Sequence, residues 1–137
     1  MTTPRGIRNN NPGNIRRSSD QWQGLRAEQT DPDFFQFETM AYGYRALIRI
    51  LQNYRRVHGL RTISEMIARW APQAENHTQS YIRAVCQDLK VTPSYQPDVN
   101  DRWTMCTLAA AISRVENGMP ARMDDIQAGW DLLRMEN

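Results

Sequence analysis

Apolar residues recur at helical spacing through the last two thirds of the chain, and this pattern constrains the fold more than any other feature. In residues 40–58, one face carries Tyr44, Leu47, Ile50, Leu51 and Tyr54. Spacings of three and four residues mark the buried face of an amphipathic helix. The same pattern predicts five helices, at 40–58, 62–70, 78–90, 101–117 and 122–135.

Capping and turn residues mark the ends of these predicted helices. Thr62 and Glu65 have the spacing of a capping box, and Asp101 is placed to cap the fourth helix. Gly118 follows that helix, where glycine commonly ends a helix. Gly43 weakens the first helix by about 1 kcal/mol relative to alanine, so we expect it to allow close packing against the N-terminal loop.

The stretch 70–78 separates the second and third predicted helices. Pro72 ends the helix before it, and Thr78 is placed to cap the helix after it. We therefore expect Glu75 and His77 on an exposed bend beside Trp70. An exposed glutamate on a bend usually has no further role, but an aromatic wall also raises a carboxyl pKa toward values that suit a general acid.

The N-terminal third is rich in asparagine and aromatic residues. Asn-Pro-Gly at 11–13 predicts a tight turn, whose neighbouring amides either bind the backbone of the loop or face a sugar. The structural role is the more common of the two. Short aromatic segments at 22–25 and 34–37 predict a small β-hairpin, joined by a polar loop that contains Asp31.

Length and composition set the class of protein. The 137 residues suit one domain, with a net charge of +2. The arginines near residues 5–26 and 45–61 fit solvated faces better than attraction to an anionic polymer. We expect no metal, no cofactor and no disulfide, because Cys86 and Cys106 fall in helical patterns and no zinc spacing occurs. No N-terminal apolar segment suggests a signal peptide, and no run is long enough to span a bilayer, so we expect synthesis in the bacterial cytoplasm.

Six short motifs follow one another between residues 5 and 90. They are Arg8-Asn-Asn-Asn-Pro-Gly-Asn-Ile-Arg16, Asp31-x-x-Phe34-x-x-Phe37, Gly43-x-Arg45-Ala46, Leu51-x-x-Tyr54, Gly59-x-x-Thr62-Ile63 and Trp70-Ala-Pro-x-x-Glu75-Asn76-x-Thr78-x-x-Tyr81-Ile82. In this order they resemble a phage and prophage protein family whose members are virion structural proteins or lysozyme-like cell-wall hydrolases. The helices at 101–135 carry no such motif and are expected to complete the core of a single domain, residues 1–137.

The Asn-Asn loop, the aromatic strand and the long helix are also similar to bacterial glucosaminidases of the lysozyme-like superfamily. This resemblance implies a mainly α (α+β) fold and a peptidoglycan substrate. The sequence departs from those enzymes at one important point. Their catalytic glutamate lies on a helix well before the Asn-Asn loop, whereas here only eight residues precede Asn9, and none of them is acidic.

The resemblance implies a glycan-strand cleaving enzyme of phage origin: a muramidase, a glucosaminidase or a lytic transglycosylase. Glu75 would then be the general acid and Asp31 the supporting carboxylate. The expected substrate-binding residues are Asn10, Asn11, Asn14, Arg16, Arg45 and Trp70. The alternative is a non-catalytic virion or glycan-binding module.

The expected partners are peptidoglycan and other virion proteins, with no nucleic acid and no membrane. We expect a monomer that acts at the cell wall or in the virion. If the resemblance is meaningful, residues 9–16 should pack near residues 70–78, with Arg45 or Arg16 linking them. Any real pocket should then lie along that seam.

Overall fold

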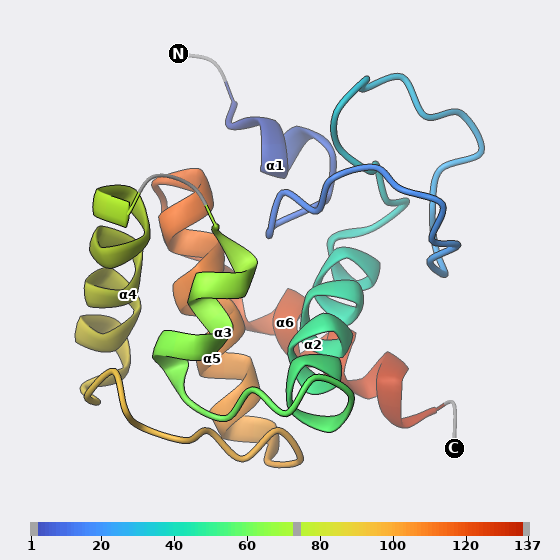
Figure 1. Ribbon diagram of the computed structural model, residues 1–137. Helices are drawn as coiled ribbons and strands as arrows, with labels where there is room; N and C mark the ends of the chain where they lie inside the picture. Colours follow the sequence, from blue (N-terminus) through green and yellow to red (C-terminus); the bar gives the residue numbers. More distant parts are fainter. Residues whose placement is uncertain (1–2, 73–74, 136–137) are drawn as a thin grey trace.

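The computed structural model describes residues 3–72 and 75–135, and this part of the chain is mainly helical, as predicted (Figure 1). Its six helices are α1 (Arg5–Arg8), α2 (Met40–Arg56), α3 (Ile63–Trp70), α4 (Glu75–Leu89), α5 (Arg102–Asn117) and α6 (Met123–Arg134). Four of the five predicted helices agree with α2, α3, α5 and α6 to within two residues at each end. The short α1 is the sixth helix, and the sequence pattern did not predict it. A lysozyme-like arrangement of these helices stays a prediction.

The helices enclose one large apolar cluster. Helix α6 packs along α2, while α5 contacts α1, α2, α4 and α6. The fully buried side chains at its centre include Leu47, Ile63, Met66, Ile112 and Ile126. These are positions that the helical spacing predicts to be inward, so the amphipathic pattern is satisfied by packing between helices.

Local capping signals work at three helix ends as the sequence predicts. Thr62 and Glu65 form a complete capping box at the start of α3. The Asp101 carboxylate accepts the backbone N–H of Thr104 at 2.9 Å. Gly118 ends α5 with φ +68°, a left-handed conformation that glycine adopts without a Cβ penalty.

The start of α4 differs from the prediction. The helix begins at Glu75, so His77 and Thr78 lie in its first turn and there is no exposed bend at these positions. Thr78 is buried, and its hydroxyl donates to the carbonyl of Ala71 at 2.6 Å. Thr78 therefore ties α4 back to the end of α3, and it is not the N-cap that the sequence pattern suggested.

The N-terminal third pairs more sparsely than the predicted hairpin. Among the described residues it has two isolated antiparallel bridges, Arg16 with Phe34 and Leu25 with Phe37. Side chains bind backbone groups that a ladder would use: Gln29 both accepts from the N–H of Gln36 and donates to its carbonyl, each at 2.8 Å. Local amides thus compete with strand pairing, and the segment folds as an irregular loop.

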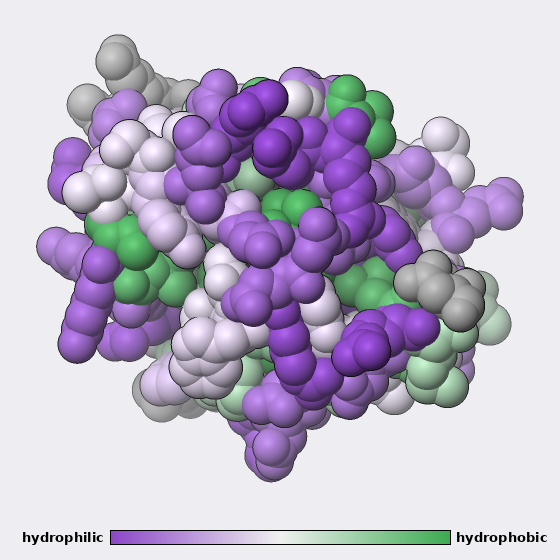
Figure 2. Space-filling model, turned by 90° about the horizontal axis from the view of Figure 1, so that it is seen from below, coloured by the Kyte–Doolittle hydropathy of each residue, from purple (hydrophilic) through white to green (hydrophobic). Residues whose placement is uncertain are grey.

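The irregular segment is held on α2 by a second, smaller apolar cluster of Phe35, Phe37 and Ala46. It lies above the other helices, together with α1 (Figure 1). Figure 2 shows the opposite, lower face, where hydrophilic side chains dominate and the hydrophobic surface is broken into small patches. Among the described helices, none is both long enough and apolar enough to cross a membrane.

Candidate functional site

An open groove of about 650 Å³ lies where the asparagine-rich loop meets the end of α3. Its walls come from residues 13–16, Phe34, α2, residues 70–72, the start of α4 and the end of α5. The loop and the segment that follows Trp70 are therefore adjacent. This confirms the prediction that these two distant stretches meet and that a pocket follows their seam.

Two glycines allow the loop to approach this closely. A Cβ on Gly43 of α2 would lie 2.1 Å from the carbonyl oxygen of Asn10, so only glycine fits beneath the loop. A Cβ on Gly13 would lie 2.6 Å from Cζ2 of Trp70. The close-packing role expected for Gly43 is confirmed, and the indole of Trp70 rests directly on the backbone of the loop.

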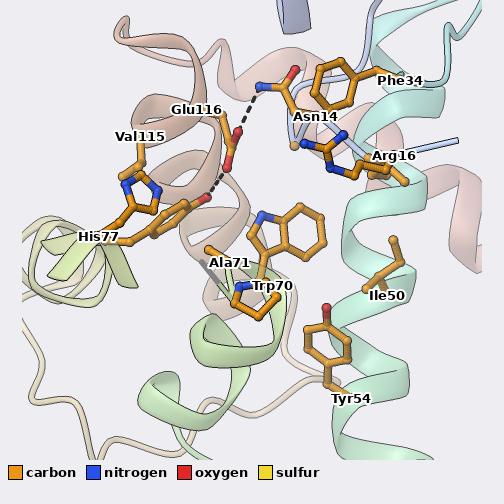
Figure 3. Close-up of a pocket in the computed structure, with 14 residues that line it drawn as sticks. Asn14, Arg16, Phe34, Ile50, Tyr54, Trp70, Ala71, His77, Val115 and Glu116 are labelled. Carbon is orange, nitrogen blue, oxygen red and sulfur yellow. Dashed lines mark hydrogen bonds between the residues drawn. The ribbon is translucent and has the colours of Figure 1, made fainter. Parts of the chain in front are cut away.

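Glu116 lies in the last turn of α5. Among the described residues that line the groove, it is the one that carries a carboxylate (Figure 3). Its Oε1 accepts from Nδ2 of Asn14 at 2.8 Å, and its Oε2 accepts from the hydroxyl of Tyr81 at 2.9 Å. Each oxygen keeps a further lone pair for a ligand. The two bonds fix the orientation of the carboxyl group while leaving it half-buried at the groove wall.

The position of Glu116 is unfavourable for its helix. A negative charge in the last turn of a helix faces the negative end of the helix dipole, which destabilises it by several tenths of a kcal/mol. Helix stability therefore gives no reason for an acid here. Residues that weaken their own helix are expected mainly at functional or strained sites.

Tyr81 is suited to hold this carboxylate. Burial, followed by the nearby charge of Glu116, raises the pKa of Tyr81 far above its ordinary value of 10.0. The phenol therefore stays protonated at neutral pH and donates its hydrogen to Glu116. The exposed ring of His77 stands edge-on to Tyr81, with 6.3 Å between ring centroids, and also lines the groove.

Aromatic side chains and one arginine complete the walls. Figure 3 shows Trp70 between the α5 side and the α2 side of the groove, with Tyr54 below it and Phe34 above. The guanidinium of Arg16 lies over the Phe34 ring, 5.1 Å from its centroid. Flat apolar rings beside polar donors form a surface of the kind that binds the faces and edges of sugar rings.

Three of the predicted substrate-binding residues line the groove: Asn14, Arg16 and Trp70. Asn14 has φ +50°, a conformation that asparagine tolerates, and this turns its amide toward Glu116. The polar link between the loop and the helices runs through that amide. The prediction had placed the link on an arginine.

The other three predicted residues are used inside the fold. Asn10 donates to the carbonyls of Phe37 and Glu38, at 3.3 and 3.2 Å. Asn11 has no exposed surface, and its amide serves the backbone of Ile15 and Phe35. Arg45 is buried in α2, with 6% of its surface exposed, and lies outside the set that lines the groove. The amides of Asn10 and Asn11 therefore bind the backbone, which is the more common role for asparagines in a turn, and Arg45 is buried.

The predicted supporting carboxylate, Asp31, is held in an ion pair away from the groove lining. Arg5 donates to both of its oxygens, at 2.5 and 2.7 Å, and Asn9 donates to one at 2.9 Å. The hydrogen bonds from Arg5, followed by those from Asn9 and the backbone, hold the pKa of the Asp31 carboxyl well below its ordinary value of 3.8. Its contacts are those of a group that joins α1 to the loop.

The predicted general acid, Glu75, begins α4, and its side chain lies outside the part of the chain that the structure describes. Its role stays a prediction. Sequence reasoning passed over Glu116, although a signal was present. The inward positions Met105, Leu108 and Ile112 of α5 continue at the same spacing to Glu116, which puts an acid on an otherwise apolar face.

Other chemistry is sparse in the described chain. Among residues 3–72 and 75–135, no three His, Cys, Asp or Glu side chains gather in position to hold a metal ion. A second hollow is lined by arginines of α2, α5 and α6, including Arg56, Arg102 and Arg134. Arg56 and Arg134 lie in the last turns of their helices, where positive charge favours the helix dipole, and Arg102 pairs with Asp131 at 2.7 Å.

Comparison with known proteins adds one clear relationship. No protein-family model matches the chain. It is similar to a protein named Protein P5 from Pseudoalteromonas phage PM2, with 38% identity over 130 residues. The alignment covers 93% of this chain and 80% of the phage protein, and therefore includes both the N-terminal loop and the helix that carries Glu116.

Proposed function

Because the chain belongs to the family of Protein P5 of Pseudoalteromonas phage PM2, we propose that it is a phage protein that binds a glycan strand of the bacterial cell wall in this groove and cuts it. The observation that carries the proposal is the placement of Glu116. A carboxyl group held in one orientation on the wall of an open, aromatic-lined groove has the position that glycoside cleavage requires of a general acid.

In the proposed mechanism, the protonated Glu116 gives its proton to the oxygen of the leaving sugar. Tyr81 and Asn14 hold the carboxyl group still, so the proton is delivered along one direction. After the sugar leaves, the same carboxylate accepts a proton from the hydroxyl group that attacks the anomeric carbon. That hydroxyl belongs either to water or to the sugar itself, and proton balance is the same in both cases.

The groove walls supply binding. Trp70 and Phe34 offer ring faces to the apolar faces of sugars, and the Asn14 amide lies at the point where sugar hydroxyl or acetamido groups would approach Glu116. Glycan strands of the bacterial wall alternate such faces and polar edges. A phage must pass that wall, which connects the family to this class of polymer.

A second candidate function is glycan binding or virion structure without cleavage. Its support is specific: Asp31, the carboxylate expected to assist Glu75, has both oxygens occupied by Arg5. The family relationship also agrees with this second candidate, because the name Protein P5 states no enzymatic activity. In this case Glu116 would accept hydrogen bonds from sugar hydroxyls and transfer no proton.

One experiment separates the two functions and also tests the two glutamates. Purified cell walls are mixed with wild type, Glu116→Gln or Glu75→Gln, and both wall binding and release of soluble sugar fragments are measured. We expect Glu116→Gln to bind walls like wild type but to release fragments at least about 100-fold more slowly. Glu75→Gln tests the other predicted acid in the same assay, and it should release fragments like wild type if Glu116 is the general acid.

Each other outcome has a definite meaning. Wild-type release by Glu116→Gln overturns the catalytic role of Glu116, and loss of release only in Glu75→Gln returns that role to Glu75. Wild-type protein that binds walls but releases nothing supports the second candidate. A protein that neither binds nor cuts walls contradicts cleavage and glycan binding, and leaves the virion structural role.

A further inference from the structure

Arg16 is an exposed cation that projects into the groove without a carboxylate partner in the described chain (Figure 3). Its backbone pairs with that of Phe34, and its guanidinium lies over the Phe34 ring. A guanidinium stacked on an aromatic face is held in position while its N–H groups remain able to donate. The loop therefore presents a partly preorganised cation to whatever fills the groove.

Two acids that could otherwise pair with Arg16, Asp31 and Asp33, are already bound by another arginine. Arg5, which lies 4.7 Å from the centroid of the same Phe34 ring, pairs with Asp31 at 2.5 Å and with Asp33 at 3.0 Å. Arg17 lies outside the groove lining and donates to the backbone carbonyl of Asp31 at 3.1 Å. Asp31 and Asp33 are thus paired with Arg5, and the charge of Arg16 faces the groove.

Arg16 and Glu116 both line the groove, one as a cation and the other as the proposed proton donor. They are linked through Asn14, which lies two residues before Arg16 and donates to Glu116 at 2.8 Å. Because two residues of chain span at most about 7 Å, the backbone of Arg16 lies within about 7 Å of the backbone of Asn14. A ligand with a negative group would be attracted to Arg16, and this attraction would fix its direction in the groove.

We infer that the groove selects glycans that carry a carboxylate on or beside the sugar next to Glu116, and that Arg16 binds this carboxylate. The inference rests on the proposed glycan-binding function and adds the chemical class of the ligand. A guanidinium and a carboxylate match in geometry and form two parallel hydrogen bonds. An uncharged glycan of the same length would contact the same aromatic walls but would leave Arg16 without a partner.

The test measures binding of three short glycans to the full chain by calorimetry. The first is a neutral N-acetylglucosamine oligomer, the second is a peptide-free wall strand with free lactyl carboxylates, and the third is that strand with its carboxylates converted to methyl esters. Binding is measured in the Glu116→Gln variant, so that the ligands are not cut during the titration. We expect the free carboxylate to bind about 10- to 100-fold more tightly than its ester, with a preference that falls as salt rises.

Variants of the loop assign the preference to one side chain. Arg16→Gln should bind the free acid and its ester equally, while Arg16→Lys should keep part of the preference. Arg17→Gln is the matched control, because Arg17 is adjacent, exposed and outside the groove lining, and it should behave like the parent. Thermal unfolding of each variant checks that the loop remains folded.

The outcomes distinguish this inference from the proposed function. Equal affinity for acid and ester, or an unchanged preference in Arg16→Gln, overturns the role of Arg16 and leaves glycan binding intact. Failure to bind any of the three glycans overturns both proposals. Retained preference in Arg16→Gln with its loss in Arg17→Gln would place the anion on the outer side of the loop, against the assignment made here.

Discussion

Replacing Gly43 with alanine should damage both the fold and the groove, although alanine is the better helix former. In an open helix this change would stabilise the protein by about 1 kcal/mol. Here the new methyl group would lie 2.1 Å from the carbonyl oxygen of Asn10 and 2.6 Å from Cδ of Pro12. Carbon and oxygen atoms pack at roughly 3.3–3.6 Å, so the loop would have to move away from α2 by more than about 1 Å.

The cost of that movement follows from the contacts of the loop. Overpacking of this kind costs about 1–3 kcal/mol. The displaced loop would also strain the hydrogen bonds that Asn10 donates to the carbonyls of Phe37 and Glu38, each worth about 1 kcal/mol. After the gain in helix propensity, the net loss is about 2 kcal/mol. For 137 residues this corresponds to a fall in melting temperature of about 7 °C.

Thermal unfolding and wall binding, measured on the same samples, test this reasoning. Gly59→Ala is the control, because Gly59 has φ +68° but no atom within 4 Å of an added methyl group. It should lose about 1 kcal/mol from backbone strain and keep normal wall binding. Gly43→Ala should lose stability and wall binding together. A Gly43→Ala protein as stable as wild type would refute the close contact between the loop and α2.

Three further outcomes are expected from single substitutions. Asp31→Asn should destabilise the protein by about 1–2 kcal/mol at pH 7, a modest value because Arg5 is 39% exposed. Folding lowers the pKa of Asp31 below 3.8. The stabilisation by Asp31 is therefore full above about pH 4 and is lost as the pH falls toward the lower pKa of the folded state. The unfolding curves of Asp31→Asn and wild type should converge in acid. Tyr81→Phe should slow fragment release about tenfold at nearly unchanged wall binding, since Glu116 loses one of its two donors; an unchanged rate contradicts the holding role. Trp70→Ala should abolish wall binding in pull-down assays, and full retention would place the glycan elsewhere.

The helices could be predicted from the sequence because their signals are local. The capping box of Thr62 and Glu65, the Asp101 cap and the left-handed Gly118 all act within four residues along the chain. Apolar spacing then identifies the buried face of each helix. The same reasoning also predicted that Gly43 lies under the N-terminal loop, since glycine inside a strong helical pattern needs a packing reason.

Local signals were misleading where a residue's partner lies farther away. Thr78 has the chemistry of an N-cap, but its hydroxyl bonds to Ala71, seven residues back, and the helix begins before it. Asn11 has the chemistry of a sugar contact, yet its amide is used by Phe35, 24 residues along the chain. The aromatic segments predicted a hairpin, but the amides of neighbouring glutamines took the backbone groups of the ladder.

The sequence by itself determined a mainly helical phage-type protein, the boundaries of most helices and the meeting of the asparagine loop with the Trp70 stretch. Only the tertiary structure decided which acid faces the groove. Glu116 is 102 residues from Asn14 and 35 residues from Tyr81, and no periodicity or motif links positions so far apart. The physical reason is that propensity and capping act over one or two turns, whereas the site is assembled by the packing of α5 against the loop and α4.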